Sequence, residues 1–343
     1  MKLSRSLIAA ALSAGLASAV SSVPAQAAGE VNIYSYRQEV LIRPLLARFS
    51  KETGIKVNVV FAKNGMIARL KVEGANSPAD VVLTVDASRL IRVKQAGVLQ
   101  PTKSEKLSAA IPAQYRDPEG YWFGMTVRGR PIIYAVGRVK PSELSTYEAL
   151  AQPKWKGRIC IRSSNHVYNQ SMLASMIAHN GVAKTEAWAK GFVANFARKP
   201  KGGDRDQIRA VAAGVCDIAI ANTYYLARMT NAKRASDREA ARKVKVFWPN
   251  QAGRGTHVNI SGAGITRSSK NHANAVKLLE FLASDEAQRI YAHKVLEYPV
   301  RSGIPVAEVL EGWGKFKADQ LNLAELAKYN ADAVKIADRA GWR

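Results

Sequence analysis

The residues of this chain that stand out for their chemistry are its tyrosines. The 343 residues include 12 tyrosines, five histidines and two cysteines. Two tyrosines are adjacent, Tyr224 and Tyr225, and they follow an apolar stretch ending at Ala221 that we expect to be a strand. In a turn, or at the first residues of a helix, adjacent phenols can converge on one point. Another tyrosine, Tyr168, follows the polar loop Ser163–His166.

Three converging phenols would suit a ferric ion. A free phenol has a pKa of about 10, and a strongly charged cation can displace its proton because metal ligands generally bind deprotonated. Tyrosinate is a hard, anionic ligand of ferric haem iron, and three such charges would balance Fe³⁺. Zn²⁺ or Cu⁺ would favour histidine and cysteine. The residue types alone also allow ordinary tyrosine packing, with hydroxyls hydrogen-bonded near the surface.

The short motifs of common enzymes are absent from the sequence. It lacks G-x-S-x-G, G-x-x-x-x-G-K-[ST], H-E-x-x-H and G-x-G-x-x-G. The histidines form no pair four residues apart; they are His166, His179, His257, His272 and His293. A Ser-His-Asp triad is assembled in space, so the sequence leaves that alternative open. We expect a protein that is not an enzyme, with an exported hydrolase as a rival interpretation.

The N-terminus has the pattern of a secretory signal peptide. Two positive residues precede the apolar stretch Leu7–Val20, and the triplet Ala25–Ala27 then offers a cleavage site of the A-x-A type. The stretch is short and rich in alanine for a membrane span, which needs about 20 mostly apolar residues. We therefore expect residues 1–27 to be a signal peptide cleaved near Ala27, and the mature chain to be exported.

The charge of the chain is strongly positive. Lysine and arginine total 51 against 27 acidic residues, a net charge of +24, and removal of Lys2 and Arg5 leaves 49 against 27. The positive residues are scattered, with no block of five or six and no interleaving with aromatic residues. We therefore expect no nucleic-acid partner. A basic surface could attract anionic lipid headgroups or an anionic ligand, or could simply keep the protein soluble.

Hydrophobic periodicity predicts an α/β protein. Strand-like and helix-like stretches alternate, and the nearly apolar strand at 79–84 indicates a parallel sheet covered on both faces. Strands are expected at 31–36, 55–61, 79–84, 132–136, 158–162, 216–221 and 243–248. Helices are expected at 41–49, 66–72, 90–96, 147–150, 170–179, 186–196, 207–213, 273–284, 284–294 and 323–339.

The order of these expected strands and helices predicts two lobes joined by a hinge. The stretches 132–136 and 243–248 are expected to cross between the lobes. The first lobe would hold residues 28–130 with about 247–300, and the second lobe residues 131–246 with about 301–343. A ligand cleft is then expected between the lobes, where strand ends and helix N-termini meet.

The two cysteines leave an open question. Cys160 and Cys216 both lie in expected strands, and an exported protein can form disulfides. They could bond if the strands are neighbours, or stay as buried thiols. A C-x-x-C metal or redox motif is absent.

Several stretches, spread in order along the whole mature chain, match the sequences of one known family. They are Ile33–Gln38, Thr53–Val57, Glu73–Val81, Trp122–Gly124, Pro153–Arg158, Tyr168–Ser171, Ala221–Tyr225 and Pro249–His257. Through them the chain resembles the periplasmic ferric-ion-binding proteins, the solute receptors of iron ABC importers, including the cyanobacterial ones. The resemblance implies a two-lobed periplasmic-binding-protein fold, a periplasmic location and delivery of iron to an inner-membrane ABC permease. We expect a monomer.

The resemblance implies that Fe³⁺ is held mainly by second-lobe tyrosinates, which are Tyr168, Tyr224 and Tyr225 here. In several members of the family a histidine near the mature N-terminus, sometimes followed by a tyrosine, completes the site. Those places hold Gln38 and Glu39 in this chain. Gln38 is a poor ligand for Fe³⁺, and Glu39 could point away.

A carbonate-like anion, or water, would make up the missing ligands. Members with Tyr-Ser-Tyr-Arg-Gln at this place resemble the branch that uses an anion. Arginine supplies cationic donors in the fork geometry that carbonate or bicarbonate needs. We expect Arg37 and Arg128 to hold the anion, with Arg130 as a substitute, and Tyr36 as a further candidate near the metal. The alternative within the same fold is a receptor for an organic solute such as a polyamine or thiamine.

Overall fold

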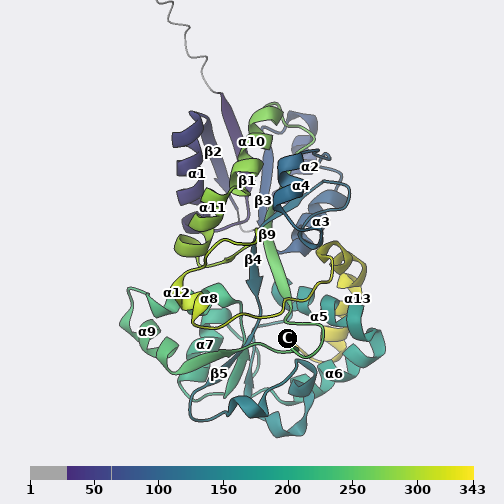
Figure 1. Ribbon diagram of the computed structural model, residues 1–343. Coiled ribbons are helices and arrows are strands. Elements are labelled where there is room, and N and C mark those ends of the chain that lie inside the picture. The colour runs from purple at the N-terminus through teal and green to yellow at the C-terminus, as the bar shows by residue number, and fades with distance from the viewer. Residues whose placement is uncertain (1–28, 63) are drawn as a thin grey trace, which may run out of the picture.

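The computed structural model describes residues 29–62 and 64–343, so the expected signal peptide lies outside the described residues. The described chain forms two α/β lobes, one above the other in Figure 1. Each lobe has its own sheet, and strands β4 and β9 run towards the junction of the lobes.

The first lobe is built on a mixed sheet with the strand order β10-β4-β9-β3-β1-β2. Strand β1 pairs in parallel with β2 and β3, whereas β9 runs antiparallel to β3 and β4. The strands are β1 (Glu30–Ser35), β2 (Lys56–Phe61), β3 (Val81–Val85), β4 (Phe123–Gly129), β9 (Val258–Ile265) and β10 (Tyr298–Pro299). The helices of this lobe are α1 (Glu39–Thr53), α2 (Met66–Glu73), α3 (Ala87–Gln95), α4 (Glu105–Ala110), α10 (His272–Leu282) and α11 (Asp285–Ile290).

Both faces of this first sheet are covered, as its apolar strands predict. Tyr34 and Val82 pack with Met66 and Leu70 of α2 in one buried cluster. The alternate positions of the same strands belong to the main core, together with the apolar side of α1. Because strand side chains alternate between faces, this division places helices on both sides of the sheet.

The second lobe has a smaller sheet with the order β6-β7-β5-β8. Strand β5 runs antiparallel to both of its neighbours, and β6 is parallel to β7. The strands are β5 (Ile132–Ala135), β6 (Ile159–Cys160), β7 (Ile218–Ile220) and β8 (Val244–Phe247). The helices are α5 (Val167–Asn180), α6 (Val182–Ala194), α7 (Asp204–Ala212), α8 (Thr223–Thr230) and α9 (Ala235–Arg242).

The two lobes are joined by short extended segments. The chain passes from β4 to β5 through Arg130 and Pro131, and it returns from β8 to β9 through residues 248–257. The stretches 132–136 and 243–248 therefore lie mostly inside the second sheet as β5 and β8, and the crossings themselves are adjacent to them. The lobe boundaries named above stay a prediction.

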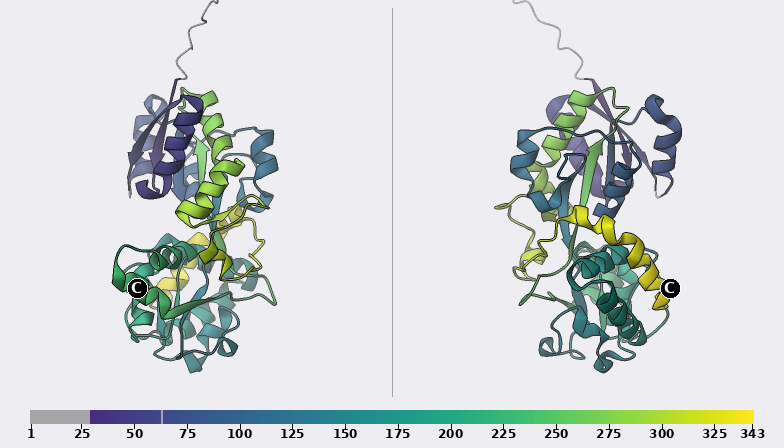
Figure 2. Two further views of the ribbon diagram at one scale, coloured as in Figure 1. Left: turned by 60° about the vertical axis from the view of Figure 1, so that its left-hand side comes forward. Right: turned by 90° about the vertical axis from the view of Figure 1, so that its right-hand side faces the viewer.

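The C-terminal part of the chain also touches both lobes. After α12 (Glu308–Glu311), helix α13 (Leu326–Arg339) packs mainly on α5 and also on α3 of the first lobe. Figure 2 shows α13 in yellow, running from the junction of the lobes along the second lobe. Helix α13 thus links the two lobes outside the strand crossings.

The sequence analysis missed β4 and β9, two central strands of the first sheet. Both contain glycines, which have low strand propensity. The glycines are required by close packing, since a Cβ atom at Gly262 or Gly264 would meet the backbone oxygen of Phe123 or Tyr121. Two expected helices also differ: residues 284–294 divide into α11 and a π-helical turn, Tyr291–Val295, and the turn at Glu148–Ala151 is a 3₁₀ helix.

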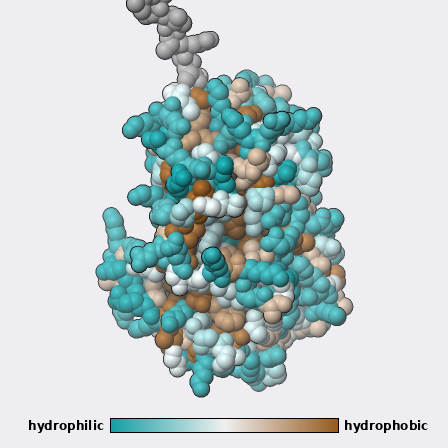
Figure 3. Space-filling model, in the orientation of Figure 1, coloured by the Kyte–Doolittle hydropathy of each residue, from teal (hydrophilic) through white to brown (hydrophobic). Residues whose placement is uncertain are grey.

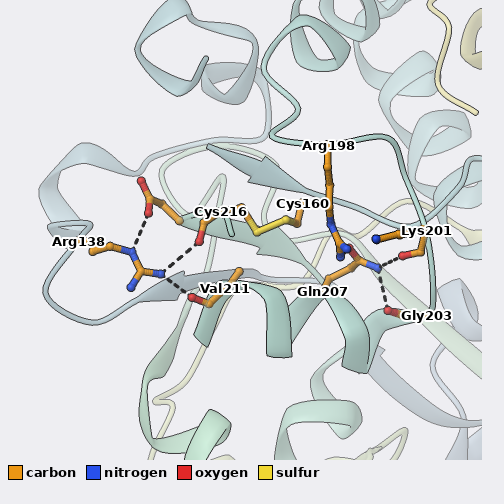
Figure 4. The surroundings of a disulfide bond; sticks show 9 residues. Arg138, Cys160, Arg198, Lys201, Gly203, Gln207, Val211 and Cys216 are labelled. Atoms are coloured by element: carbon orange, nitrogen blue, oxygen red, sulfur yellow. Dashed lines mark hydrogen bonds and ion pairs between the residues drawn. A yellow bond between two sulfur atoms is a disulfide. The ribbon is translucent and has the colours of Figure 1, made fainter. Parts of the chain in front are cut away.

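The two cysteines form a disulfide. The sulfur atoms of Cys160 and Cys216 are 2.04 Å apart, and the bond joins the last residue of β6 to a residue two positions before β7 (Figure 4). Arg138 donates hydrogen bonds to the carbonyl oxygen of Cys216 at 3.2 Å and to the carboxylate of Asp217 at 2.8 Å. The sequence left open whether these cysteines bond or stay as thiols. They bond because β6 and β7 are neighbouring parallel strands.

The face of the molecule drawn in Figure 3 is largely hydrophilic, and apolar residues gather near the junction of the lobes. Across the described ranges, the structure contains no helix that combines the length and the hydropathy of a membrane-spanning segment.

Candidate metal centre

The start of helix α5 fixes the position of Tyr168. His166 caps this helix, and its Nδ1 atom accepts a hydrogen bond from the backbone N–H of Tyr168 at 3.3 Å. The two rings also meet edge to face, with 4.3 Å between their centroids. Burial, followed by the nearby charge of Arg162, lowers the pKa of His166 to about 3. The imidazole is therefore neutral near pH 7 and can keep accepting this hydrogen bond.

The start of helix α8 fixes the other two tyrosines. The short link after β7 leads to Asn222 at the N-cap of α8, so Tyr224 and Tyr225 fall in its first turn. Their ring centroids are 4.2 Å apart. The hydroxyl oxygens of Tyr168 and Tyr224 are 3.2 Å apart. The structure thus brings together phenols from two helix starts that are 56 residues apart in sequence.

Burial keeps the phenols of Tyr224 and Tyr225 protonated in the absence of a cation. The pKa of Tyr224 is raised well above its usual value, first by burial and then by the neighbouring phenols of Tyr168 and Tyr225, while Arg128 opposes the shift. The pKa of Tyr225 is also raised, mainly by burial. A bound cation would therefore have to displace protons from oxygens that hold them more tightly than free tyrosine does.

A shell of arginines surrounds the three tyrosines. The guanidinium carbons nearest the Tyr168 ring centroid belong to Arg128 at 5.3 Å, Arg162 at 5.5 Å and Arg130 at 5.8 Å. Arg205 lies over the Tyr225 ring at 5.2 Å. Such a shell stabilises phenolate oxygens and repels a bare cation, so it favours a cation accompanied by negative groups.

Among the described arginines beside the tyrosines, Arg128 has the most unpaired buried donors. It is buried, and its Nη1 atom donates to the hydroxyl of Ser261 at 2.9 Å. Its Nε and Nη2 atoms are buried with no hydrogen-bond partner among the described residues. Unpaired buried donors are uncommon and call for an explanation. An anion beside the tyrosines would satisfy them, as expected from the sequence.

Arg37 lies next to Arg128, but more of its guanidinium nitrogens have hydrogen-bond partners. Its Nη1 atom donates to the same Ser261 hydroxyl, and its Nη2 atom pairs with the carboxylate of Glu297 at 2.9 Å. Among the described residues only its Nε atom lacks a partner. The hydroxyl of Thr126 also donates to Glu297. Arg37 therefore has less capacity for an anion than Arg128.

Arg130, the expected substitute, is engaged by protein groups. Its Nη1 atom donates to Asp204 at 3.1 Å and to the side-chain oxygen of Asn222 at 2.9 Å. Its Nη2 atom donates to the side-chain oxygen of Asn169 at 2.5 Å. Both terminal nitrogens are thus occupied, which does not favour a role for Arg130 in holding an anion.

The first-lobe candidates have other partners. Gln38 is exposed at the N-cap of α1, and Glu39 pairs with Arg43 on the same helix. The hydroxyl of Tyr36 accepts a hydrogen bond from the backbone N–H of Ile67 at 3.1 Å. None of the hydrogen bonds or ion pairs recorded for the described residues joins these three side chains to the tyrosine trio. Their part in a metal site stays a prediction.

The lobes touch directly beside the tyrosines. The hydroxyl of Ser171, one turn after Tyr168 on α5, donates to the carboxylate of Asp86 at 2.6 Å. The hydroxyls of Ser88 and Ser171 are 2.9 Å apart. The lobes are therefore closed over the site, and Tyr168 and Tyr224 are only 6% and 5% exposed.

Comparison with known proteins places the chain in a family. The model of bacterial extracellular solute-binding proteins matches residues 76–318. The chain belongs to this family. It is 49% identical over 315 residues to iron uptake protein A1 of Synechocystis sp., covering 92% of this chain and 88% of that protein. It is 28% identical over 312 residues to the Fe(3+)-binding periplasmic protein of Serratia marcescens, covering 90% and 89%.

A solved structure of similar sequence has the same fold as this solute-binding protein. It is the Trichodesmium protein IdiA (FutA) in complex with iron and citrate ligands, with a TM-score of 0.89, 52% identity, and coverage of 92% of this chain and 100% of that chain. The predicted two-lobed periplasmic-binding-protein fold and the resemblance to ferric-iron receptors are confirmed. The relatives named here are binding or uptake proteins by description.

Three features of this solute-binding protein's site escaped the sequence analysis. They are the carboxylate of Asp204, the contact of Ser171 with Asp86, and the pairing of Arg37 with Glu297. Each joins residues far apart in the chain. A local signal existed only for Asp204, which follows Gly202-Gly203 and lies three residues before the helix expected at 207–213. Among the described residues, no group of three or more histidine, cysteine, aspartate or glutamate residues is arranged to hold a metal ion.

Proposed function

We propose that this chain is a periplasmic receptor that binds ferric iron and delivers it to an inner-membrane ABC importer. The observation that carries the proposal is the 3.2 Å approach of the Tyr168 and Tyr224 hydroxyls, with the ring of Tyr225 in tilted contact with that of Tyr224. The iron-related descriptions of its relatives support it. The ferric ion is the cargo, and the receptor works as a monomer that catalyses no reaction and binds no nucleic acid.

The tyrosines would bind the iron as phenolates. Three phenolate charges neutralise Fe³⁺, and the arginine shell offsets the cost of keeping these charges in a buried place. The unpaired Nε and Nη2 donors of Arg128 would hold a carbonate-like anion next to the metal. The anion would replace the first-lobe ligands that Gln38 and Glu39 do not supply.

Capture and release follow from the closed lobes. In the closed form the tyrosines are buried, so iron would enter when the lobes separate, and closure by hinge rotation would then bury it. The organic-solute alternative has less support, because a polyamine would need carboxylates where this site has arginines.

Visible absorption tests the proposal. Phenolate-to-iron charge transfer should give the loaded wild-type protein a coloured band. The triple variant Tyr168→Phe, Tyr224→Phe, Tyr225→Phe should lose the band and more than about 100-fold in ferric affinity, a larger loss than an outer partner of a metal ligand usually causes. Tyr329→Phe on α13 is the control and should behave like the wild type. An unchanged band in the triple variant would show that the iron is bound elsewhere.

A further inference from the structure

One buried carboxylate connects the segments that carry the tyrosines. Asp204 is the first residue of α7 and is 1% exposed. Its Oδ1 atom accepts from Arg162 at 3.0 Å. Its Oδ2 atom accepts from Arg130 at 3.1 Å and from the backbone N–H of Asn222 at 2.9 Å. Both oxygens are therefore occupied by donors from other parts of the chain.

The donors to Asp204 come from three separate connections. Arg162 lies in the loop between β6 and α5, before Tyr168. Asn222 is the N-cap of α8, two residues before Tyr224. Arg130 lies at the crossing between the lobes, and it also donates to Asn169 on α5. Asp204 thus ties together both tyrosine-bearing helix starts and one interlobe crossing.

The Asp204 carboxylate is also the counter-ion of two arginines beside Tyr168. The side chains of Arg130 and Arg162 are only 2% and 14% exposed, and Asp204 is the acidic group that pairs with both. Without it, the buried guanidinium of Arg130 and the largely buried one of Arg162, both beside the Tyr168 ring, would lack their counter-ion and would have to move or be hydrated. Either change would alter the place where the Tyr168 and Tyr224 hydroxyls meet.

Resting on the function proposed above, we infer that Asp204 is a positioning residue of the iron site. Its carboxylate holds Arg130, Arg162 and the N-cap of α8, and so sets the relative position of the Tyr168 and Tyr224 hydroxyls. By occupying the Nη1 atom of Arg130, it also leaves Arg128, with two unpaired donors, as the arginine best able to receive an anion. Asp204 touches neither the metal nor the anion in this role.

The chain offers a matched control two residues away. Asp206 lies in the same first turn of α7, but its side chain is 49% exposed. It accepts a hydrogen bond from the backbone N–H of Gly203 at 2.8 Å and pairs with Arg209 on the same helix. Asp206→Asn removes the same charge from the same turn without touching the tyrosine-bearing connections.

The experiment compares Asp204→Asn with Asp206→Asn in the mature protein. We expect Asp204→Asn to weaken ferric affinity about 10- to 100-fold, the usual effect of losing an outer partner of a metal ligand, and to shift the charge-transfer band. The shifted band is the readout that a general loss of stability would not produce. Asp206→Asn should keep the wild-type affinity and band. Wild-type affinity and an unshifted band in Asp204→Asn would overturn the inference.

Hydrogen exchange on the iron-free protein separates this inference from the proposed function. Asp204→Asn should increase amide exchange in residues 161–170 and 221–228, and Asp206→Asn should not. Unchanged exchange in both segments would refute the positioning role even if the wild type binds iron. If the wild type gives no ferric band, the proposed function fails, and the exchange data still decide the role of Asp204.

A second variant covers the case in which Asp204→Asn does not fold. Arg162→Gln removes one ion pair at the partly exposed side and leaves the pairing of Asp204 with Arg130. It should show a smaller loss of affinity, about threefold to tenfold, below the usual range for a complete outer partner, and faster exchange in residues 161–170. Wild-type affinity together with wild-type exchange in this variant would also overturn the inference.

Discussion

At the scale of single residues, the protons on the tyrosines determine how the site responds to pH. Burial raises the pKa of Tyr224 and of Tyr225 above the usual value, so both are protonated near neutral pH. His166 and His257 stay neutral, because burial lowers the pKa of each to about 3. A change in iron binding between pH 5 and pH 8 should therefore come from protons displaced from phenols rather than from these histidines.

The resulting prediction concerns proton release. Each phenolate that forms on iron binding releases a proton, so affinity should fall as the pH falls, by up to about three log units per pH unit for three phenols. Competition with a chelator at several pH values, corrected for the chelator's own titration, measures this slope. A slope near zero would mean that the phenols do not bind the iron, and the Tyr→Phe variants should show a smaller slope.

Some of this site could be predicted from residue types, and some could not. The convergence of Tyr224 with Tyr168 could be predicted, because a strand end followed by a helix start places side chains at one edge of a sheet. The engagement of Arg130 by protein groups could not be predicted, since its partner Asp204 lies 74 residues away and the pairing exists only after the lobe has folded. The free donors of Arg128 became visible only once its neighbours were known.

At the scale of elements, the disulfide joins the two strands that lead to the tyrosines. Cys160 ends β6, whose following loop reaches Tyr168, and Cys216 precedes β7, which leads to Tyr224. The parallel pairing of these strands was not predictable from the sequence, which left the bond open. Strands β4 and β9 were also missed for a reason that is visible only in the fold. Their glycines lower the local strand propensity, and only the packed sheet shows why glycine is needed.

Removing this bond should lower stability more than it affects binding. The bond closes a long loop, since the cysteines have a sequence separation of 56. The variant Cys160→Ala, Cys216→Ala should lose about 2–5 kcal/mol of unfolding free energy, because the unfolded chain gains conformational freedom. It should keep the ferric band, since Asp204 still holds both helix starts. Urea unfolding followed by circular dichroism gives the stability. An unfolding midpoint equal to that of the wild type would contradict this account.

At the scale of the whole molecule, the closed lobes define how a ligand reaches the site. The contact of Ser171 with Asp86 and Ser88 joins the lobes beside Tyr168. Asp86 keeps a positive φ of 78° while its other carboxylate oxygen accepts from Asn259 at 2.9 Å. Asp86 is thus held by its own lobe in the geometry that receives Ser171, and we expect this contact to break when the lobes separate.

A covalent lock across this contact should trap iron inside or keep it outside. The Ser88 and Ser171 hydroxyls are 2.9 Å apart, close enough for cysteines at both places to form a disulfide after small adjustments. The oxidised Ser88→Cys, Ser171→Cys variant should fail to take up iron when locked empty, and should retain iron against a chelator when locked full. Reduction should restore exchange.

The single variant Ser171→Cys, treated with the same reductant, reports any effect of reducing the Cys160–Cys216 bond. Iron exchange in the locked protein at the wild-type rate would show that iron reaches the tyrosines without separation of the lobes. The burial of Tyr168 and Tyr224 argues against such a path. We therefore expect the lobes to separate for loading and for release, and the lock measures that requirement directly.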